Sequence, residues 1–185
     1  MTRTLIIKNM VCNRCKTIVK QLLDNENFEV ISLELGKAVV NKAEKNDYTK
    51  LEKRLNKEGF ELIKTSSEFL VEQIKIRLIE NINKSNTELM PSQLAEELGK
   101  TYSVVSKTFS KSEGITLEKY VIRLKIEKVK ELIQLKQLNF SEIAHRLNYN
   151  TSSHLAKQFK NITGMSMSEY QKLQDWDRKS LDQIV

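Results

Sequence analysis

Two cysteines near the start of the chain have the types and spacing for chemistry, and they are the only two among its 185 residues. Cys12 and Cys15 are separated by two residues, which is close enough for both sulfur atoms to bind one ion. Two thiolates alone suit a soft ion of linear geometry such as Cu(I), whereas Zn²⁺ favours four ligands and would have to take two from elsewhere. A pair so close together does not make a secreted disulfide framework. The spacing therefore predicts metal binding, with thiol redox chemistry as the less favoured alternative.

The residues around the pair affect how readily the thiols ionise. Cys15 is predicted to open a helix, where the helix dipole and the neighbouring Arg14 or Lys16 lower the pKa of the thiol and favour the metal-binding thiolate. The alternative is a pair of ordinary reduced cysteines in a domain that serves as a dimerisation or peptide-binding surface. A thioredoxin-like site is disfavoured, because that family faces its cysteines with a cis-proline and the single proline here, Pro91, lies far along the chain.

A second group of polar residues lies between Phe140 and Tyr170, where we predict a helix, a tight turn and another helix. Ser141 is placed to cap the first helix, and the apolar pattern breaks between Asn148 and Thr151. The outer face of the second helix combines small hydroxyls, lysines and a histidine, with no carboxylate: Ser152, Ser153, His154, Lys157 and Lys160. Such a face suits a groove lined by phosphates.

The elements that position the cysteines are predicted to follow the order β-α-β-β-α-β from Thr4 to about Thr65, which is a ferredoxin-like fold of the α+β class. The strands are Leu5–Ile7, Phe28–Leu35 with Ile31, Leu33 and Leu35 on one face, Ala38–Val40 and Glu61–Lys64. The first helix starts at Cys15 and turns Ile18, Val19, Leu22 and Leu23 inward, while Asp47 caps the second. A further helix between Lys64 and Asn86 is predicted to couple this domain to the rest of the chain.

The helix-turn-helix arrangement occurs twice, which indicates an internal repeat in an all-α domain. Seven positions after Pro91 match positions of the later unit in the same order, at a spacing of 49 before the turn and 50 after it. The matched residues of the first copy are Leu94, Ala95, Leu98, Val105, Phe109, Gly114 and Tyr120. We therefore predict two helix-turn-helix units.

A single long helix, Leu117 to Leu135, is predicted between the two copies, and it has two apolar stripes. One stripe comprises Leu117, Tyr120, Val121, Leu124, Leu132 and Leu135, and the other, roughly 150° away, comprises Ile122, Ile126, Val129 and Ile133. Two apolar faces are explained if this helix packs against one helix-turn-helix unit on each side. Two recognition helices held in this way would enter successive major grooves of DNA about 34 Å apart.

Positive charge is concentrated in the helical part. The net charge is +7 and the isoelectric point is near 9.3. Between Lys100 and Lys172 thirteen basic residues face six acidic ones, an excess equal to that of the whole chain. This balance predicts a nucleic-acid partner. No apolar run is long enough to span a membrane and no signal-peptide core is evident, so we expect a cytoplasmic protein. We expect no enzyme, because the only candidate catalytic groups are the two thiols.

Residues 4–65 resemble the heavy-metal-associated domain of copper chaperones and metal-pumping ATPases, whose loop after the first strand has the pattern GMxCxxC. The matching segment is Asn9-Met10-Val11-Cys12-Asn13-Arg14-Cys15, and Gly59-Phe60 matches the family's Gly-aromatic pair before the last strand. Asn9 stands where the family has glycine, and Val11 where it has Thr or Asp. The resemblance implies that Cys12 and Cys15 bind a soft metal ion, with copper favoured over zinc.

Residues 67–173 resemble the C-terminal DNA-binding domain of bacterial AraC-type transcription regulators, which has seven helices in two helix-turn-helix units with a linking helix. The residues that carry this resemblance are Ile143, Ala144, Leu147, Asn148, Tyr149, Ser153, Leu155, Phe159, Lys160, Thr163, Gly164, Ser166, Glu169 and Tyr170. The resemblance implies base contacts from the first recognition helix, at Tyr102, Ser103, Ser106 and Lys107. Lys111 is a further predicted DNA-binding residue. In the second, Ser152, Ser153, Ala156 and Lys157, with His154 and Lys160, would mainly position the domain.

The sequence therefore predicts three segments: a metal-binding domain at residues 1–66, a DNA-binding domain at 67–173 and a C-terminal tail at 174–185. The predicted function is sequence-specific transcription regulation on double-stranded DNA, in response to Cu(I) at Cys12 and Cys15. RNA polymerase and a second copy of the chain are further candidate partners. The main alternative retains DNA binding and makes the first segment a metal-free dimerisation or docking module. Another alternative is a metal chaperone whose helical part recognises a protein.

Overall fold

The computed structural model describes residues 2–41, 47–83, 91–173, 177–179, 181 and 184, and the chain divides into two compact units, Met1–Ile76 and Arg77–Val185. The division falls within helix α3 (Ser66–Asn83), later than the predicted domain boundary near residue 66. The first half of α3 therefore belongs to the N-terminal unit and its second half to the C-terminal unit. No helix in the described residues is long and apolar enough to cross a lipid bilayer.

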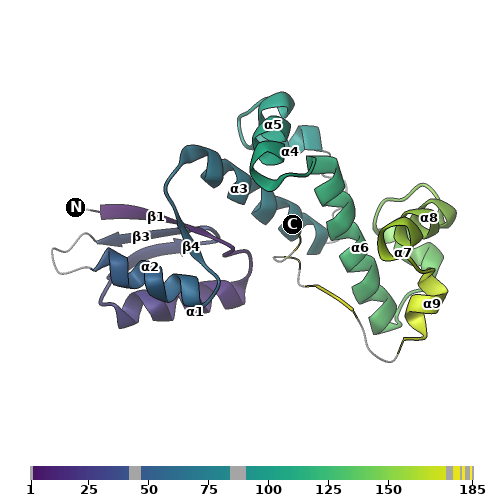
Figure 1. The fold of residues 1–185 in the computed structure, drawn as a ribbon, viewed down its shortest axis with the longest axis horizontal. Coiled ribbons are helices and arrows are strands. Elements are labelled where there is room, and N and C mark those ends of the chain that lie inside the picture. The colour runs from purple at the N-terminus through teal and green to yellow at the C-terminus, as the bar shows by residue number, and fades with distance from the viewer. Residues whose placement is uncertain are drawn as a thin grey trace. The chain divides into compact units, whose positions relative to one another are not determined.

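The N-terminal unit has the predicted element order β-α-β-β-α-β around one antiparallel sheet. Its elements before α3 are β1 (Thr2–Lys8), α1 (Asn13–Asn25), β2 (Val30–Glu34), β3 (Lys37–Asn41), α2 (Tyr48–Lys57) and β4 (Glu61–Ile63). The strands lie in the order β2-β3-β1-β4, and Figure 1 shows α1 and α2 together on one face of the sheet. Because strand side chains alternate between faces, every second residue joins the core. This core contains Leu5, Ile7, Ala38 and Val40 from the strands, Val19 and Leu23 from α1, and Leu51 and Leu55 from α2.

Two residues predicted to face this core lie at the surface instead. The register of β2 is irregular between Val30 and Ser32, and Ile31 between them is 52% exposed. Such an irregularity breaks the strict alternation that predicted an inward Ile31. Helix α1 begins at Asn13 with Cys12 as its N-cap, not at Cys15, and Ile18 is 37% exposed.

The C-terminal unit consists of the second half of α3 and six more helices within the described residues. These are α4 (Pro91–Glu97), α5 (Tyr102–Glu113), α6 (Leu117–Leu135), α7 (Phe140–Arg146), α8 (Ser152–Thr163) and α9 (Met167–Gln171). Figure 1 shows α4 and α5 against one end of α6, with α7, α8 and α9 against its other end. The predicted pair of helix-turn-helix units on a linking helix is thereby confirmed.

Helix α6 is buried by both helix-turn-helix units, as its two apolar stripes predict. Near its start, the ring of Tyr120 packs against Phe109 of α5 with the ring centroids 5.0 Å apart. Farther along, Ile126 and Val129 join the core formed with α7, α8 and α9. Leu135, which was assigned to the first stripe, is the last residue of α6 and is 51% exposed.

The start of α7 differs from the prediction, because its N-cap is Asn139 and not Ser141. The Asn139 Oδ1 atom accepts hydrogen bonds from the backbone N–H groups of Ser141 and Glu142, both at 3.0 Å. In return, the Asn139 N–H donates to Glu142 Oε2 at 2.7 Å. This reciprocal capping box satisfies amides at the helix start that have no partner within the helix.

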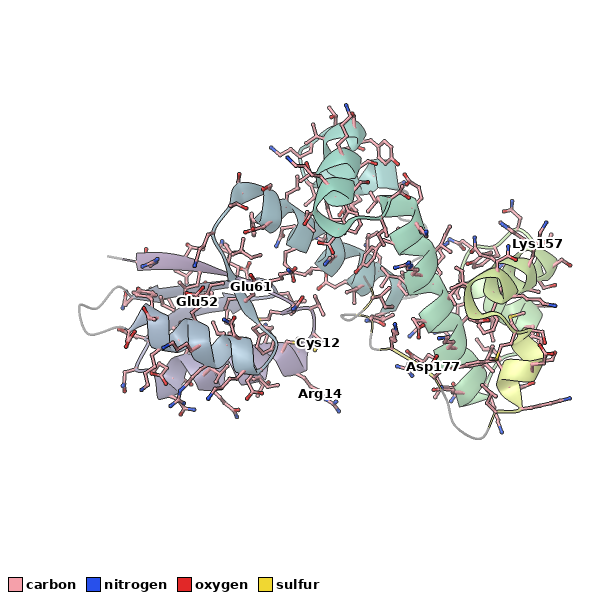
Figure 2. The ribbon with its side chains drawn as sticks, in the orientation of Figure 1. Cys12, Arg14, Glu52, Glu61, Lys157 and Asp177 are labelled. Carbon is pink, nitrogen blue, oxygen red and sulfur yellow. The ribbon has the colours of Figure 1, made fainter. Side chains whose placement is uncertain are left out.

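Part of the C-terminal tail lies against α6, where Figure 2 shows Asp177 beside this helix. Lys130 Nζ donates to the Asp177 carbonyl oxygen at 2.9 Å and to Glu127 Oε1 at 2.8 Å. The Lys179 N–H donates to Glu127 Oε2 at 3.0 Å. The tail thus covers a buried ion pair on α6, a contact that no pattern in the sequence predicted.

Candidate nucleic-acid interface and cysteine loop

The two recognition helices, α5 and α8, are anchored by the same set of local interactions. Thr101 caps α5 by accepting from the Val104 N–H at 3.4 Å, and Thr151 caps α8 by accepting from the His154 N–H at 3.1 Å. The inward residues are Val105 and Phe109 in α5 and Leu155 and Phe159 in α8, all with no exposed surface. Each helix ends at a glycine in the left-handed conformation, Gly114 with φ 69° and Gly164 with φ 81°. The repeat in the sequence is therefore a repeat in structure.

The outer face of α5 carries the predicted base-reading residues. Ser103, Lys107 and Lys111 are exposed, while Ser106 is half-buried. The Tyr102 hydroxyl donates to the Glu118 carboxylate at the start of α6, so this side chain is held towards the linking helix. Val104 is 44% exposed beside them. Its apolar type gave no reason to include it among the predicted contacts, although a solvent-facing valine on a recognition helix can contact a thymine methyl group.

The outer face of α8 carries the predicted positioning residues. Ser153, His154, Lys157 and Lys160 are exposed, whereas Ser152 and Ala156 are half-buried. Figure 2 shows Lys157 on the outer side of α8, away from α6. The His154 ring packs edge-to-face on Tyr149, with the centroids 5.6 Å apart. The α5 and α8 residues do not form one cluster, because the two helices lie against opposite ends of α6.

Tyr149 organises the turn between α7 and α8. Its hydroxyl donates to Gln158 Oε1 at 2.5 Å, and burial raises its pKa to about 12. Lys125 Nζ lies 5.2 Å from the centre of the Tyr149 ring and donates to the Leu147 carbonyl oxygen at 3.0 Å. Burial lowers the pKa of Lys125. These contacts from Lys125 on α6 stabilise the turn between α7 and α8.

The cysteine loop lies between β1 and α1. Cys12 is exposed and Cys15 is half-buried, and their sulfur atoms are 2.9 Å apart. Cys12 Sγ also accepts from the Cys15 N–H at 3.4 Å, so the first cysteine caps the helix that holds the second. Figure 2 shows Arg14 extending away from Cys12. Among the described residues, no third cysteine, histidine or carboxylate joins the pair.

The predicted lowering of the Cys15 pKa is wrong. Burial is the largest influence and raises the pKa of the Cys15 thiol, and the hydrogen bond with Cys12 raises it further. The backbone hydrogen bonds from the loop oppose this shift without reversing it. The helix-dipole argument failed because it neglected how far α1 withdraws Cys15 from water.

Asn9, three residues before Cys12, holds this loop in place. Its φ is +68°, a conformation that asparagine tolerates better than other non-glycine residues. The Asn9 side chain donates from Nδ2 to the Gly59 carbonyl oxygen at 2.8 Å. The asparagine therefore preserves a backbone geometry that glycine would otherwise supply, and it adds a hydrogen bond to the loop before β4.

Two helix pairs, α4–α5 and α7–α8, packed on the shared helix α6 define the C-terminal unit as a double helix-turn-helix domain. Residues 94–173 match a family model described as a helix-turn-helix domain, and this match runs from α4 to just beyond α9. This match agrees with the helix-turn-helix units predicted for the C-terminal part of the chain. The family match does not extend to the cysteine loop.

Two curated proteins are similar to this chain. The Msm operon regulatory protein of Streptococcus mutans serotype c is 25% identical over 108 residues, which cover 58% of this chain and 38% of that protein. The probable transcriptional regulator LumQ of Photobacterium leiognathi is 26% identical over 103 residues, which cover 55% of this chain and 42% of that protein. The chain therefore spans about two fifths of the length of these relatives.

Solved structures are similar over a comparable share of the chain. The C-terminal domain of AraT, a response regulator from Geobacillus stearothermophilus, is 26% identical with a TM-score of 0.49, covering 58% of this chain and 90% of that one. The C-terminal domain of the two-component response regulator yesN from Fusobacterium nucleatum is 25% identical with a TM-score of 0.46, covering 52% and 96%.

Proposed function

We propose that the protein is a transcription regulator that binds double-stranded DNA through its two helix-turn-helix units. The observation that carries this proposal is the pair of recognition helices, α5 and α8, which share caps, buried anchors and glycine ends on one linking helix. Their outer faces present hydroxyl and ammonium groups, which donate hydrogen bonds to phosphate and base-edge acceptors. The names of the two curated relatives, both regulators, support the same function.

The two units are proposed to differ in role. On α5, Ser103 and Lys107 are exposed and can donate to base edges in the major groove. On α8, Lys157 and Lys160 supply charge for phosphates, while the half-buried Ala156 offers no hydrogen bond. Sequence preference therefore depends mainly on α5, and α8 sets the position of the domain on the duplex.

The test is a binding titration on duplex DNA recovered with the protein from cells, compared with an unrelated duplex of equal length. We expect tighter binding to the recovered duplex, and a linear fall in the logarithm of affinity with the logarithm of salt concentration as counterions are released. A protein with no salt-dependent affinity for either duplex would contradict DNA binding. That result would favour the chaperone whose helical part recognises a protein.

For the N-terminal unit, we propose a ferredoxin-like domain that binds a soft metal ion, Cu(I) in preference to Zn²⁺. The support is the donor set: two adjacent thiols at the exposed start of α1, with no third ligand among the described residues. Two sulfur donors suit a two-coordinate soft ion. Ligation would displace the thiol protons, and the two sulfur atoms, which lie 2.9 Å apart, would have to separate to take opposite sides of a two-coordinate ion.

Metal binding is tested by chelator competition on the reduced protein. We expect one Cu(I) per chain in the wild type and none in Cys12→Ser or Cys15→Ser. The DNA titration is then repeated with and without Cu(I) for the wild type and Cys12→Ser. Equal DNA affinity in all four cases would remove metal sensing and leave DNA binding intact.

A metal-free docking or dimerisation module is the second candidate for the N-terminal unit. It is favoured by the exposed Ile31 on β2, which is an edge strand of the sheet, and by the raised pKa of Cys15, which disfavours the thiolate. In this case, sedimentation should show dimers that Ile31→Lys disrupts, and the reduced protein should bind no Cu(I).

A further inference from the structure

The cysteine loop is joined to helix α3 by a partly buried hydrogen bond that has no part in the predicted metal site. The Asn9 N–H donates to Glu72 Oε1 at 2.7 Å. Glu72 lies in the first half of α3 and is only 1% exposed, so its carboxylate is held out of water beneath the loop. A buried carboxylate depends strongly on its hydrogen bonds. The loop and the helix therefore stabilise each other.

A second contact joins the same elements through Gly36, in the turn between β2 and β3. The Gly36 N–H donates to the Met10 carbonyl oxygen at 3.1 Å, which links the turn to the cysteine loop. A Cβ atom on Gly36 would lie 2.7 Å from Ile76 Cδ1, so α3 packs directly on this glycine. Ile76 follows Glu72 by four residues and lies on the same face of α3. The cysteine loop and the β2–β3 turn bonded to it thus contact α3 at two points about one turn apart.

Helix α3 continues beyond these contacts into the C-terminal unit. In its second half, Leu78, Ile79 and Ile82 are buried, and Arg77 pairs with Glu97 of α4 at 3.3 Å. The sequence of α3 contains no proline or glycine, which are the usual causes of a sharp bend. Helix α3 therefore contributes buried residues to both units.

We propose that Glu72 couples metal ligation at Cys12 and Cys15 to the position of helix α3. This inference rests on the proposed metal binding. An ion bound by both sulfur atoms fixes the loop that contains Asn9, and the Asn9–Glu72 hydrogen bond is the direct link from that loop to α3. Glu72 is a positioning residue, because it is proposed to act through its hydrogen bond to the backbone N–H of Asn9.

The first test uses the metal-free full chain and measures hydrogen exchange in peptides covering residues 5–11 and 66–76. In Glu72→Ala, we expect about tenfold faster exchange at Asn9, because a hydrogen bond to a charged partner is lost. Glu72→Gln retains an acceptor oxygen and replaces the alanine variant if that variant fails to fold. Its exchange rate at Asn9 should lie between the rates of the wild type and Glu72→Ala. Glu80→Gln, a charge removal elsewhere on α3, is the matched control and should match the wild type. If Asn9 exchanges in Glu72→Ala at the same rate as in the wild type, the proposal is overturned.

The second test adds one equivalent of Cu(I) to the same variants, with chelator competition to confirm binding. Wild type and Glu80→Gln should show a metal-dependent change in exchange over residues 66–76. Glu72→Ala should bind the same amount of Cu(I) and lose this change. If Glu72→Ala retains the full change, the coupling role is overturned while metal binding stands. A wild type that binds no Cu(I) would instead overturn the metal site, and one that binds Cu(I) without a change over residues 66–76 would overturn the coupling.

Discussion

At the residue scale, Asn9 combines two structural tasks in one side chain. It adopts a left-handed backbone conformation, with φ +68°, and its amide donates to the Gly59 carbonyl oxygen. Its own N–H donates to the buried Glu72 carboxylate, so the backbone conformation also aims a donor at α3. Asparagine at this position therefore supports a left-handed backbone conformation just before the cysteine loop.

Replacing Asn9 separates these contributions. Asn9→Gly removes only the side-chain hydrogen bond, whereas Asn9→Ala removes it and also forces a Cβ-bearing residue without local hydrogen bonding into a left-handed conformation. We expect Asn9→Ala to lower the free energy of unfolding by about 1 kcal/mol more than Asn9→Gly. Urea denaturation of the two variants side by side measures the difference. Equal midpoints would show that the backbone at Asn9 is not strained by alanine.

The raised pKa of Cys15 has a consequence for thiol reactivity and for stability. Burial, the larger cause, remains in Cys12→Ser, so alkylation of Cys15 in this variant should reach half its maximal rate at a higher pH than in the urea-unfolded chain. The folded state binds this proton more tightly than the unfolded state. The Cys15 thiol therefore contributes fully to stability below its pKa in the unfolded chain. This contribution is lost as the pH rises through its pKa in the folded protein. If Cys15 reached its half-maximal alkylation rate at a lower pH in the folded protein than in the unfolded chain, burial would not raise its pKa.

At the scale of elements, the N-cap of α7 in the structure differs from the N-cap predicted from the sequence. Asn139 accepts two backbone N–H groups, while Ser141 lies inside the first turn and is exposed. Asn139→Ala should lower the free energy of unfolding by about 1 kcal/mol, and Ser141→Ala should change it by less than about 0.5 kcal/mol. Thermal unfolding of the two variants gives the comparison. A larger loss for Ser141→Ala would restore the sequence-based assignment of the cap.

The order of the elements could be predicted because it depends on local periodicity. Residues alternating along β1 and β3, or spaced by four in α5 and α8, reveal which face is buried before any partner is known. Ile31 could not be placed, because a bulge depends on the register that β2 adopts against β3. The raised pKa of the Cys15 thiol likewise depends on its burial in the folded unit. These two predictions failed because the state of each residue depends on partners outside its own segment.

At the scale of the whole molecule, the proposed DNA contacts lie on two helices with different surfaces. Lys107→Ala should narrow the difference in affinity between the recovered duplex and an unrelated one, because an exposed side chain on α5 is proposed to reach base edges. Lys157→Ala should weaken binding to both duplexes alike and reduce the salt slope by about one counterion. Titrations of both variants at several salt concentrations measure these effects. Identical behaviour of the two variants would show that α5 and α8 do not divide the roles as proposed.

Helix α6 sets the distance and the rotation between the two helix-turn-helix units, because both pack on this one 19-residue helix. One extra residue inserted near its middle would lengthen it by about 1.5 Å and rotate one recognition helix by about 100° relative to the other. Seven extra residues would nearly restore the rotation while adding about 10 Å. If α5 and α8 bind DNA as proposed, the length of α6 sets the rotation between the two DNA segments that they contact. An insertion in α6 should then change which duplexes bind without altering any residue proposed to contact a base.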